Sequence, residues 1–339
     1  MITISLCMIV KNEEKVLARC LDSICDLMDE IIIVDTGSTD RTKEIAAKYT
    51  DKIYDFVWIN DFAAARNFAF SKATKEYIYS ADADEVVNLE NHERFRILKE
   101  NLVPEIEIVQ MKYGNQLAHN TVYNFDEEYR PKLFKRLREF VWEEPIHETV
   151  RTQPVVFDSD IVITHLPENL HAGRDLAAFG RMWERRQPIS ARLHEMYAKE
   201  LFIAGTPENF ADAEEFFETS VCDVNRSGDE VLQACLVVAR AARYAGDEGK
   251  FFKHIMKVVA GGECSEACFE LGEYYFAKKD YDEAVIWFYN AKFETSPILN
   301  IRLGGERALE RLAECYDCLG DEAQALLYRR MIEDGREAN

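Results

Sequence analysis

The sequence has no long uncharged apolar run and comparatively little positive charge. After the opening residues, no segment reaches the eighteen or so uncharged apolar residues that a membrane-spanning helix needs. Lys and Arg total 41 against 62 Asp and Glu, a net charge of −21, which argues against non-specific binding to nucleic acid or an anionic membrane surface. The apolar residues 1–10 have no basic stretch before them, and KNEE follows in place of a signal-peptide cleavage site. We therefore expect a soluble, cytoplasmic enzyme of bacterial type.

The cysteines do not form a pattern typical of disulfides. Nine of them, an odd number, are scattered through apolar helix and strand patterns, as reduced buried thiols usually are. The four near the carboxyl end lie inside helical periodicity rather than on turns, which disfavours the alternative of a zinc site; they are Cys264, Cys268, Cys315 and Cys318. A length of 339 residues is enough for two domains.

Negative charge is concentrated directly after one apolar segment. Residues 76–81 carry Tyr77 and Tyr79 on alternate positions and read as a strand entering a core, and the chain then continues with Asp82, Asp84 and Glu85. Three carboxylates within four residues repel one another, so a divalent cation bound through oxygen atoms is expected there. A solvated acidic turn is the alternative, and Glu85 is either part of the cluster or a cap of the next segment.

The first half of the chain alternates strand and helix patterns. Residues 4–10 are almost uniformly apolar, as strands buried on both faces of a parallel sheet are. Residues 29–35 are a second predicted buried strand, which ends in Asp35, and the helix expected from Glu14 to Met28 connects the two. Residues 51–58 and 105–115 are further predicted strands, and Pro131 makes residues 129–136 a predicted edge strand. Because Asp35 and Asp82 both end strands, their side chains are expected at the carboxyl edge of the sheet, where open α/β sheets bind ligands.

A helix is predicted over residues 60–73. Asp61 is its expected cap. Arg66 and Asn67 share one turn, where Arg66 can bind a phosphate or hold an acidic loop and Asn67 can satisfy backbone groups.

Four motifs in order carry a resemblance to a known family. They are SLCMIVKNEE, IIIVDTGSTDRT, NDFAAARNFA and ADADE, at residues 5–14, 31–42, 60–69 and 81–85. Together they resemble the family 2 glycosyltransferases of the GT-A fold, in particular the branch in which a peptide or protein glycosyltransferase carries a helical-repeat tail, such as the bacteriocin S-glycosyltransferases. The resemblance covers residues 1–90 strongly. It implies an α/β nucleotide-sugar-binding domain with a mixed sheet over residues 1–170.

The resemblance also implies roles for individual residues in donor binding. Asp82 and Asp84, the Asp-x-Asp motif, would hold Mn²⁺ or Mg²⁺ at the donor diphosphate, where a metal stabilises the leaving group, and Asp82 would also contact the donor. Asn12 and Glu13 would lie near the base or ribose. Asp35 would accept a hydrogen bond from the base or ribose, with a cap on the following helix as its alternative role. Arg66 would lie near the diphosphate or support the metal loop.

A second polar cluster follows at residues 141–150. Inverting transfer needs a carboxylate or imidazole to remove the acceptor's proton, and the candidates are Glu144, His147 and Glu148. His147 is alternatively a metal ligand. A thiol acceptor would need less help from a base. His165, after apolar residues, is a further candidate for a metal ligand or donor contact, although the related enzymes show a His followed soon by Gly-Tyr where this chain has HLPENLHAGRD; a structural role is its alternative.

The second half of the chain is helical in pattern. Residues 270–291 match the 34-residue tetratricopeptide template at positions that include Leu271, Gly272, Ala284 and Phe288, and more degenerate hairpins flank them. We expect an all-α, tetratricopeptide-like helical-repeat domain over residues 171–339. Such stacks offer a surface for peptides or for homodimerisation, or they buttress the catalytic domain.

The sequence thus predicts a metal-dependent, inverting glycosyltransferase. Its donor would be a nucleotide sugar, by resemblance a uridine diphosphate sugar, and its acceptor a peptide, protein or glycan. A non-catalytic nucleotide-sugar-binding scaffold is one rival. A nucleotidyltransferase is another, but it would need a glycine-rich basic phosphate loop where this chain has KNEE.

Overall fold

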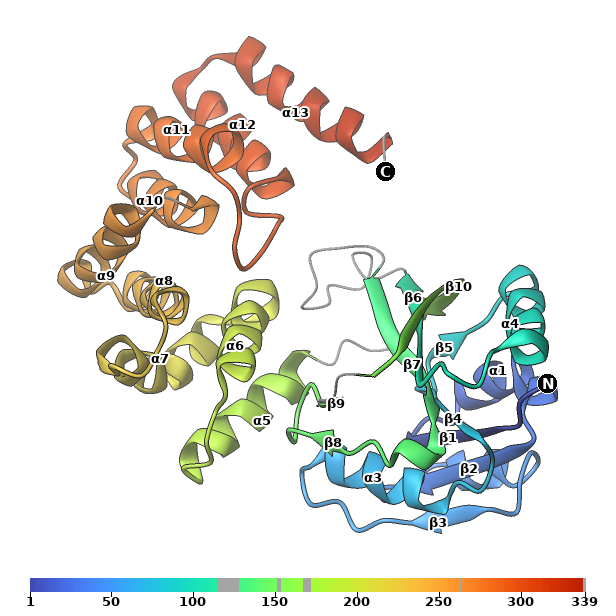
Figure 1. Ribbon diagram of the computed structural model, residues 1–339. Coiled ribbons are helices and arrows are strands. Elements are labelled where there is room, and N and C mark those ends of the chain that lie inside the picture. Colours follow the sequence, from blue (N-terminus) through green and yellow to red (C-terminus); the bar gives the residue numbers. More distant parts are fainter. Residues whose placement is uncertain (115–127, 151–153, 167–171, 263, 338–339) are drawn as a thin grey trace. The chain divides into compact units, whose positions relative to one another are not determined.

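The computed structural model describes residues 1–114, 128–150, 154–166, 172–262 and 264–337. The chain divides into two compact units, Met1–His171 and Ala172–Asn339. The first combines a sheet with helices and the second is helical (Figure 1). The domain boundary expected between residues 170 and 171 falls on residues outside those described. Among the described residues, no helix has both the length and the apolar character needed to cross a bilayer.

An eight-stranded mixed sheet forms the first unit, in the order β3-β2-β1-β4-β7-β6-β10-β5. β1 is parallel to β2 and β4, and β2 is parallel to β3. β7 is antiparallel to both of its neighbours, β4 and β6, while β6 and β10 are parallel and β5 is antiparallel to β10. The strands are β1 (Ile4–Val10), β2 (Glu30–Asp35), β3 (Ile53–Asp55), β4 (Tyr77–Ser80), β5 (Glu85–Val86), β6 (Ile108–Gly114), β7 (Glu128–Lys135) and β10 (Val156–His165). The predicted mixed α/β sheet is confirmed.

β1 is apolar at nearly every position because the sheet is covered on both faces. Leu6 and Met8 of β1 point into one core, with Leu17 of α1 (Leu17–Asp22) and Phe95 of α4 (Leu89–Asn101). Cys7 points into the other core, which includes residues of α3 (Phe62–Lys72). The short helix α2 (Thr42–Ala46) follows β2. As predicted, Asp61 caps α3, accepting a hydrogen bond of 2.9 Å from the backbone N–H of Ala64.

The prediction of an edge strand at Pro131 was wrong. β7 lies inside the sheet, between β4 and β6. The register of β6 against β7 shifts between Val109 and Gln110, and Gln110 lies opposite Pro131. An irregularity of this kind accommodates a residue that cannot donate to the ladder.

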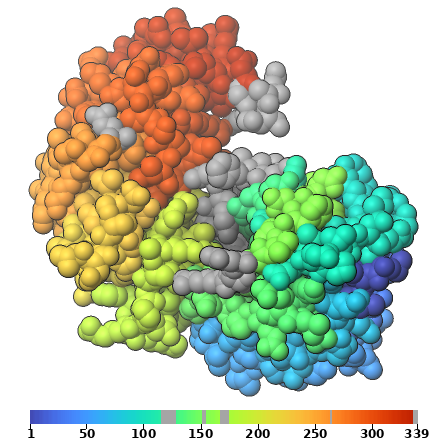
Figure 2. Space-filling model, in the orientation of Figure 1, coloured from blue at the N-terminus to red at the C-terminus, as the bar shows by residue number. Residues whose placement is uncertain are grey.

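The second unit is all-helical, as predicted, and its helices pack mainly on their sequence neighbours. In the space-filling view its colours follow one another from yellow-green to red (Figure 2). Gly272 allows close packing in one hairpin, because a Cβ there would lie 2.6 Å from the ring of the buried Phe288. The helices are α5 (Ala172–Glu184), α6 (Ala191–Ala204), α7 (Pro207–Cys222), α8 (Gly228–Ala245), α9 (Glu248–Gly261), α10 (Ser265–Ala277), α11 (Tyr281–Tyr289), α12 (Glu306–Leu319) and α13 (Glu322–Glu337).

Candidate active site

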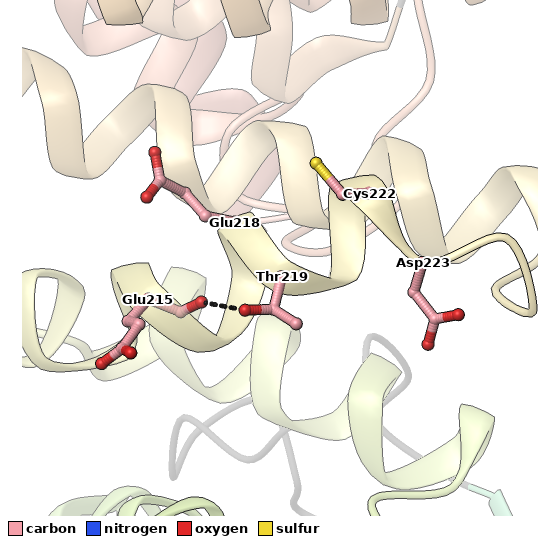
Figure 3. Close-up of a pocket in the computed structure, with 5 residues that line it drawn as sticks. All are labelled: Glu215, Glu218, Thr219, Cys222 and Asp223. Carbon is pink, nitrogen blue, oxygen red and sulfur yellow. Dashed lines mark hydrogen bonds between the residues drawn. The ribbon is translucent and has the colours of Figure 1, made fainter.

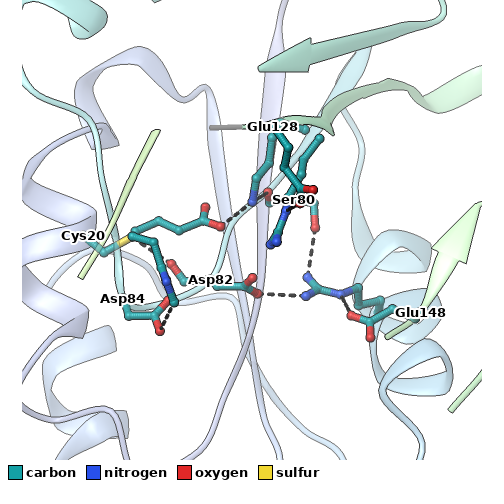
Figure 4. Close-up of polar contacts among 11 residues, drawn as sticks. Cys20, Ser80, Asp82, Asp84, Glu128 and Glu148 are labelled. Carbon is teal, nitrogen blue, oxygen red and sulfur yellow. Dashed lines mark hydrogen bonds and ion pairs between the residues drawn. The ribbon is translucent and has the colours of Figure 1, made fainter. Parts of the chain in front are cut away.

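The acidic residues after β4 form a tight turn at the carboxyl edge of the sheet. The backbone N–H of Glu85 donates to the carbonyl of Asp82 over 3.2 Å, which closes the turn. The three side chains differ in exposure: 38% for Asp82, 15% for Asp84 and 2% for Glu85. Each carboxylate has its own basic partner, and each partner comes from a different element (Figure 4).

Arg66 of α3 is the partner of Asp82. Its guanidinium donates to Asp82 Oδ1 over 2.8 Å and to Ser80 Oγ over 3.0 Å, and its Nε forms an ion pair with Glu148. Burial opposes ionisation, but the positive charges of Arg66 and Lys132 lower the pKa of Asp82 to about 2. Asp82 is therefore a carboxylate at neutral pH. These contacts are those of a residue that supports the acidic turn, one of the two roles expected for Arg66.

Lys132 of β7 is the partner of Glu85. It is buried, forms an ion pair with the Glu85 carboxylate and donates to the carbonyl of Ser80 over 3.3 Å. Burial raises the pKa of Glu85 in spite of this ammonium. Glu85 does not cap α4, since that role belongs to Asn88. Sequence reasoning missed Lys132; the signal was a lysine directly before two apolar residues, Leu133 and Phe134, in a predicted strand.

His165, the last residue of β10, is the partner of Asp84. Its Nε2 lies 3.1 Å from Asp84 Oδ2, and the backbone N–H of Leu166 donates to the Asp84 carbonyl over 2.9 Å. Pairing of β10 with β5 places His165 opposite Glu85. From the sequence, His147 was the first candidate for a metal-ligating imidazole. In the structure, the histidine that contacts Asp84 is His165.

Asn12 and Asp35, in the loops after β1 and β2, both make hydrogen bonds to residues 37–39. Asn12 has a positive φ of 57°, and its Oδ1 accepts from the backbone N–H of Thr39 over 2.8 Å. Asp35 Oδ2 accepts from the backbone N–H groups of Gly37 and Ser38, both over 3.0 Å. Its other oxygen, Oδ1, is buried and has no hydrogen-bond partner in the described part of the chain. Asp35 therefore orders a turn rather than capping α2, whose N-cap is Arg41.

The remaining predicted residues lie on nearby loops. The backbone N–H of Glu13 donates to Thr42 Oγ1 over 2.7 Å, which joins the β1 loop to α2. Glu144 and His147 lie in the turn between β8 (Trp142–Glu143) and β9 (Thr149–Val150), with φ of 72° and 47°. Glu148 ends this turn and is held by Arg66.

Asn67 fastens the β8–β9 segment to α3. Its side-chain amide donates to the Trp142 carbonyl over 3.0 Å and accepts from the Trp142 N–H over 2.8 Å. The prediction that Asn67 satisfies backbone groups is confirmed.

A separate hollow lies on α7 in the helical unit (Figure 3). Glu218 in this hollow forms an ion pair with Lys250, and Thr219 Oγ1 donates to the Glu215 carbonyl over 3.0 Å. The lining residues are Glu215, Glu218, Thr219, Cys222 and Asp223. These contacts are internal to the helices and indicate no ligand.

Several known proteins are similar to parts of this chain. Residues 5–157 match the family model described as glycosyl transferase family 2. Over 90 residues the chain is 49% identical to a TPR repeat-containing protein of Synechococcus elongatus, and over 91 residues it is 43% identical to the prophage-derived glycosyltransferase SunS of Bacillus subtilis. Each alignment covers 26% of this chain and 22% of the relative, so the chain spans less than a quarter of the length of these relatives.

Two solved structures also show similarity. Glucosyl-3-phosphoglycerate synthase from Mycobacterium tuberculosis, in complex with Mn²⁺, UDP and phosphoglyceric acid, is 15% identical with a TM-score of 0.41, covering 54% of this chain and 78% of that one. TarS residues 1–349 from S. aureus are 14% identical with a TM-score of 0.37, covering 85% and 90%. The family match agrees with the resemblance found in the amino-terminal motifs: residues 5–157 of this chain are similar to the family 2 glycosyltransferases.

Proposed function

We propose that the chain is a metal-dependent glycosyltransferase that moves a sugar, with inversion, from a nucleotide-sugar donor to a peptide, protein or glycan. A uridine diphosphate sugar is the proposed donor. The observation that carries this proposal is the pairing of Asp84 with His165 at the carboxyl edge of the sheet, beside an ionised Asp82. Carboxylate oxygen and imidazole nitrogen are ligands that suit Mn²⁺ and related divalent ions.

The charge around the acidic turn fits a cation. Among the described side chains that form ion pairs at this turn, five carboxylates face three permanently charged basic groups, with His165 left out of the count. The carboxylates are Asp82, Asp84, Glu85, Glu128 and Glu148, and the basic groups are Arg66, Arg130 and Lys132. The excess of negative charge favours a divalent ion.

The residues present fit a metal that is shared with the donor. No three His, Cys, Asp or Glu side chains form a complete metal site within the described residues. Asp84 and His165 would hold the ion, and the diphosphate and water would complete its ligands, as Mg²⁺ and substrate phosphates commonly do. A divalent ion there would offset the negative charge that develops on the leaving diphosphate. The observed contact favours His165 over His147 as the imidazole ligand.

The donor's nucleoside is proposed to lie against Asp35. The buried Oδ1 of Asp35 needs a hydrogen-bond donor, and an N–H of the base or an O–H of the ribose would supply one. Asn12 and Glu13 shape this end of the site, since both join the β1 loop to the segment after Asp35.

The acceptor's proton is proposed to pass to a residue of the β8–β9 turn. Glu148 is engaged by Arg66, so we assign it to holding that guanidinium against the acidic turn. Glu144 and His147 are then the candidate bases, each to be tested by alanine substitution with donor hydrolysis and transfer measured separately.

The proposal is tested by Asp84→Ala. We expect nucleotide release from UDP-sugars in Mn²⁺ to fall by about 100-fold or more, because a ligand of the proposed ion is removed. The melting temperature should change little. Asp26→Ala is the matched control, since Asp26 forms a similar pair with His92 at 2.8 Å on the surface. Full activity of Asp84→Ala would refute the metal assignment, and absence of nucleotide binding by the wild-type protein would favour the scaffold alternative.

A further inference from the structure

One buried ammonium group joins both ends of the acidic turn. Lys132 Nζ donates to the carbonyl of Ser80, the residue at the end of β4, over 3.3 Å. The same atom forms an ion pair with the carboxylate of Glu85, the first residue of β5. The segment between these two contacts contains Asp82 and Asp84. Lys132 and Glu85 are 6% and 2% exposed.

Stability alone does not explain this pair. Desolvation largely offsets the attraction of a buried ion pair, so well-packed apolar residues at the same positions are often at least as stable. The two residues that follow Lys132 in β7, Leu133 and Phe134, are apolar and fully buried. What the ion pair supplies and apolar contacts do not is directional bonding to two specific oxygen atoms.

Lys132 also lies near the residues that surround His165, the second proposed metal ligand. Its Nζ is 5.2 Å from the centroid of the Tyr113 ring. The centroid of that ring is 5.3 Å from the centroid of the His165 imidazole. The lysine therefore contacts the turn that carries Asp84 and the aromatic ring that packs against His165.

We propose that Lys132 is a positioning residue that fixes the span of the Ser80–Glu85 segment and thereby presents Asp84 and His165 together to a divalent ion. The inference rests on the proposed function, because it assumes that these two residues bind the ion. A positioning role of Lys132 would change the affinity of the protein for the metal ion, whereas a purely structural role would change the stability of the fold.

The test uses the double variant Lys132→Met/Glu85→Met in the full chain. Removing both partners leaves no unpaired buried charge, so the fold is expected to persist. The dissociation constant for Mn²⁺, measured by calorimetry with UDP present, should rise about 10-fold or more, the usual effect of losing a residue that orients metal ligands. If the double variant fails to fold, Lys132→Gln replaces it: its shorter amide cannot hold both ends of the turn, and the same rise is expected.

Lys99→Met is the matched control. Lys99 is another buried lysine of the same unit, and its Nζ also binds one carbonyl and one carboxylate, Leu27 at 2.6 Å and Asp29 at 2.7 Å. These contacts precede β2, at the opposite edge of the sheet. The control should lower the melting temperature without changing Mn²⁺ affinity.

The outcomes separate the two proposals. If the wild-type protein binds Mn²⁺ and the Lys132 variant binds it equally well, the positioning role is overturned while the proposed function stands. If the Lys99 control weakens Mn²⁺ binding as much as the Lys132 variant does, the effect is one of general stability and the positioning role is again overturned. If the wild-type protein does not bind Mn²⁺ with UDP, the proposed function fails and this inference with it.

Discussion

At the scale of single residues, the three neighbouring carboxylates of the acidic turn differ in the basic group with which each one pairs. Asp82 pairs with a guanidinium, Glu85 with an ammonium and Asp84 with an imidazole. Of these three bases, the imidazole is the one that commonly exchanges a proton for a metal ion near neutral pH. The Asp84 position is therefore the place in the turn where a cation can bind without displacing a permanent charge.

Asp35 supplies a prediction for donor binding. Asp35→Asn should weaken UDP binding by about 10-fold to 100-fold, because one charged hydrogen bond contributes about 1.5–3 kcal/mol. The amide oxygen of Asn can still accept from Gly37 and Ser38, so the turn should persist. Calorimetric titration with UDP measures the effect. Asp55→Asn, at the exposed end of the neighbouring strand β3, should leave UDP affinity unchanged, and unchanged affinity in Asp35→Asn would refute the nucleoside assignment.

The residues that sequence reasoning identified are those whose positions depend on local patterns. Asp35 and Asp82 follow apolar strands that the sequence makes plain, so their place at one edge of a parallel sheet could be predicted. Lys132 and His165 reach the same turn through pairing of β7 with β4 and of β10 with β5. Such pairings join residues 47 and 81 positions apart, and no short-range periodicity reveals them.

At the scale of elements, apolar runs predict the strands, and small residues at positions of close contact predict the helical hairpins. Gly246 and Gly320 end α8 and α12 in the left-handed conformation that favours glycine. The interior position of β7 was not predictable from its composition, because Pro131 is accommodated by a register shift in which Lys132 of β7 is the extra residue. An extra residue beside a proline can thus allow that proline to lie inside a sheet.

Gly272 gives a prediction for the packing of α10 on α11. Gly272→Ala should destabilise the helical unit by about 1–3 kcal/mol, since the added Cβ would lie 2.6 Å from a ring that cannot move freely in a full core. Gly249→Ala is the contrasting control: Gly249 is exposed in α9 with only an ordinary contact to Asp247, and alanine there should stabilise by about 0.5–1 kcal/mol. Thermal unfolding measures the stability of both variants. An equal change in stability for Gly272→Ala and Gly249→Ala would contradict the packing argument.

We expect the buried His254 of α9 to make the stability of the helical unit depend on pH. Burial and the nearby Lys253 and Lys257 lower the pKa of His254 to about 4, and both ring nitrogens lack partners among the described residues. A histidine whose folded-state pKa is lowered takes up its proton more readily when unfolded. Stability should therefore be lost as pH falls from about 6.5 towards 4, by up to about 3 kcal/mol.

The variant that checks this is His254→Leu. Its melting temperature should fall less between pH 7 and pH 4.5 than that of the wild-type protein, because the group that must gain a proton is absent. A parallel decrease in both proteins would show that His254 does not set the acid limit.

At the scale of the whole molecule, every proposed donor and metal residue lies in the first unit. They extend from Asn12 to His165, and the unit ends at His171. This unit has its own cores on both faces of its sheet, so it should fold without the helices. Under this proposal, the helical unit would be free to bind the acceptor or to self-associate.

A fragment of residues 1–171 tests this division. It should retain Mn²⁺-dependent hydrolysis of the donor within a few-fold of the full chain, and it should lose transfer to a macromolecular acceptor. Circular dichroism confirms folding, and nucleotide release and acceptor labelling are measured in parallel. Transfer at the full-length rate would reduce the helical unit to a support, and loss of donor hydrolysis in a folded fragment would show that the site needs residues beyond His171.

The pairing of β10 with β5 has a consequence for how the protein is made. His165 leaves the ribosome 81 residues after Asp84, which corresponds to about 4 to 16 s at ordinary rates of synthesis. Throughout that interval the three carboxylates after β4 are already present, while the histidine that pairs with Asp84 has not yet been made. The proposed donor site is thus among the last parts of its domain to be completed, and slow translation between these two residues would prolong the time for which the nascent sheet lacks its final strand.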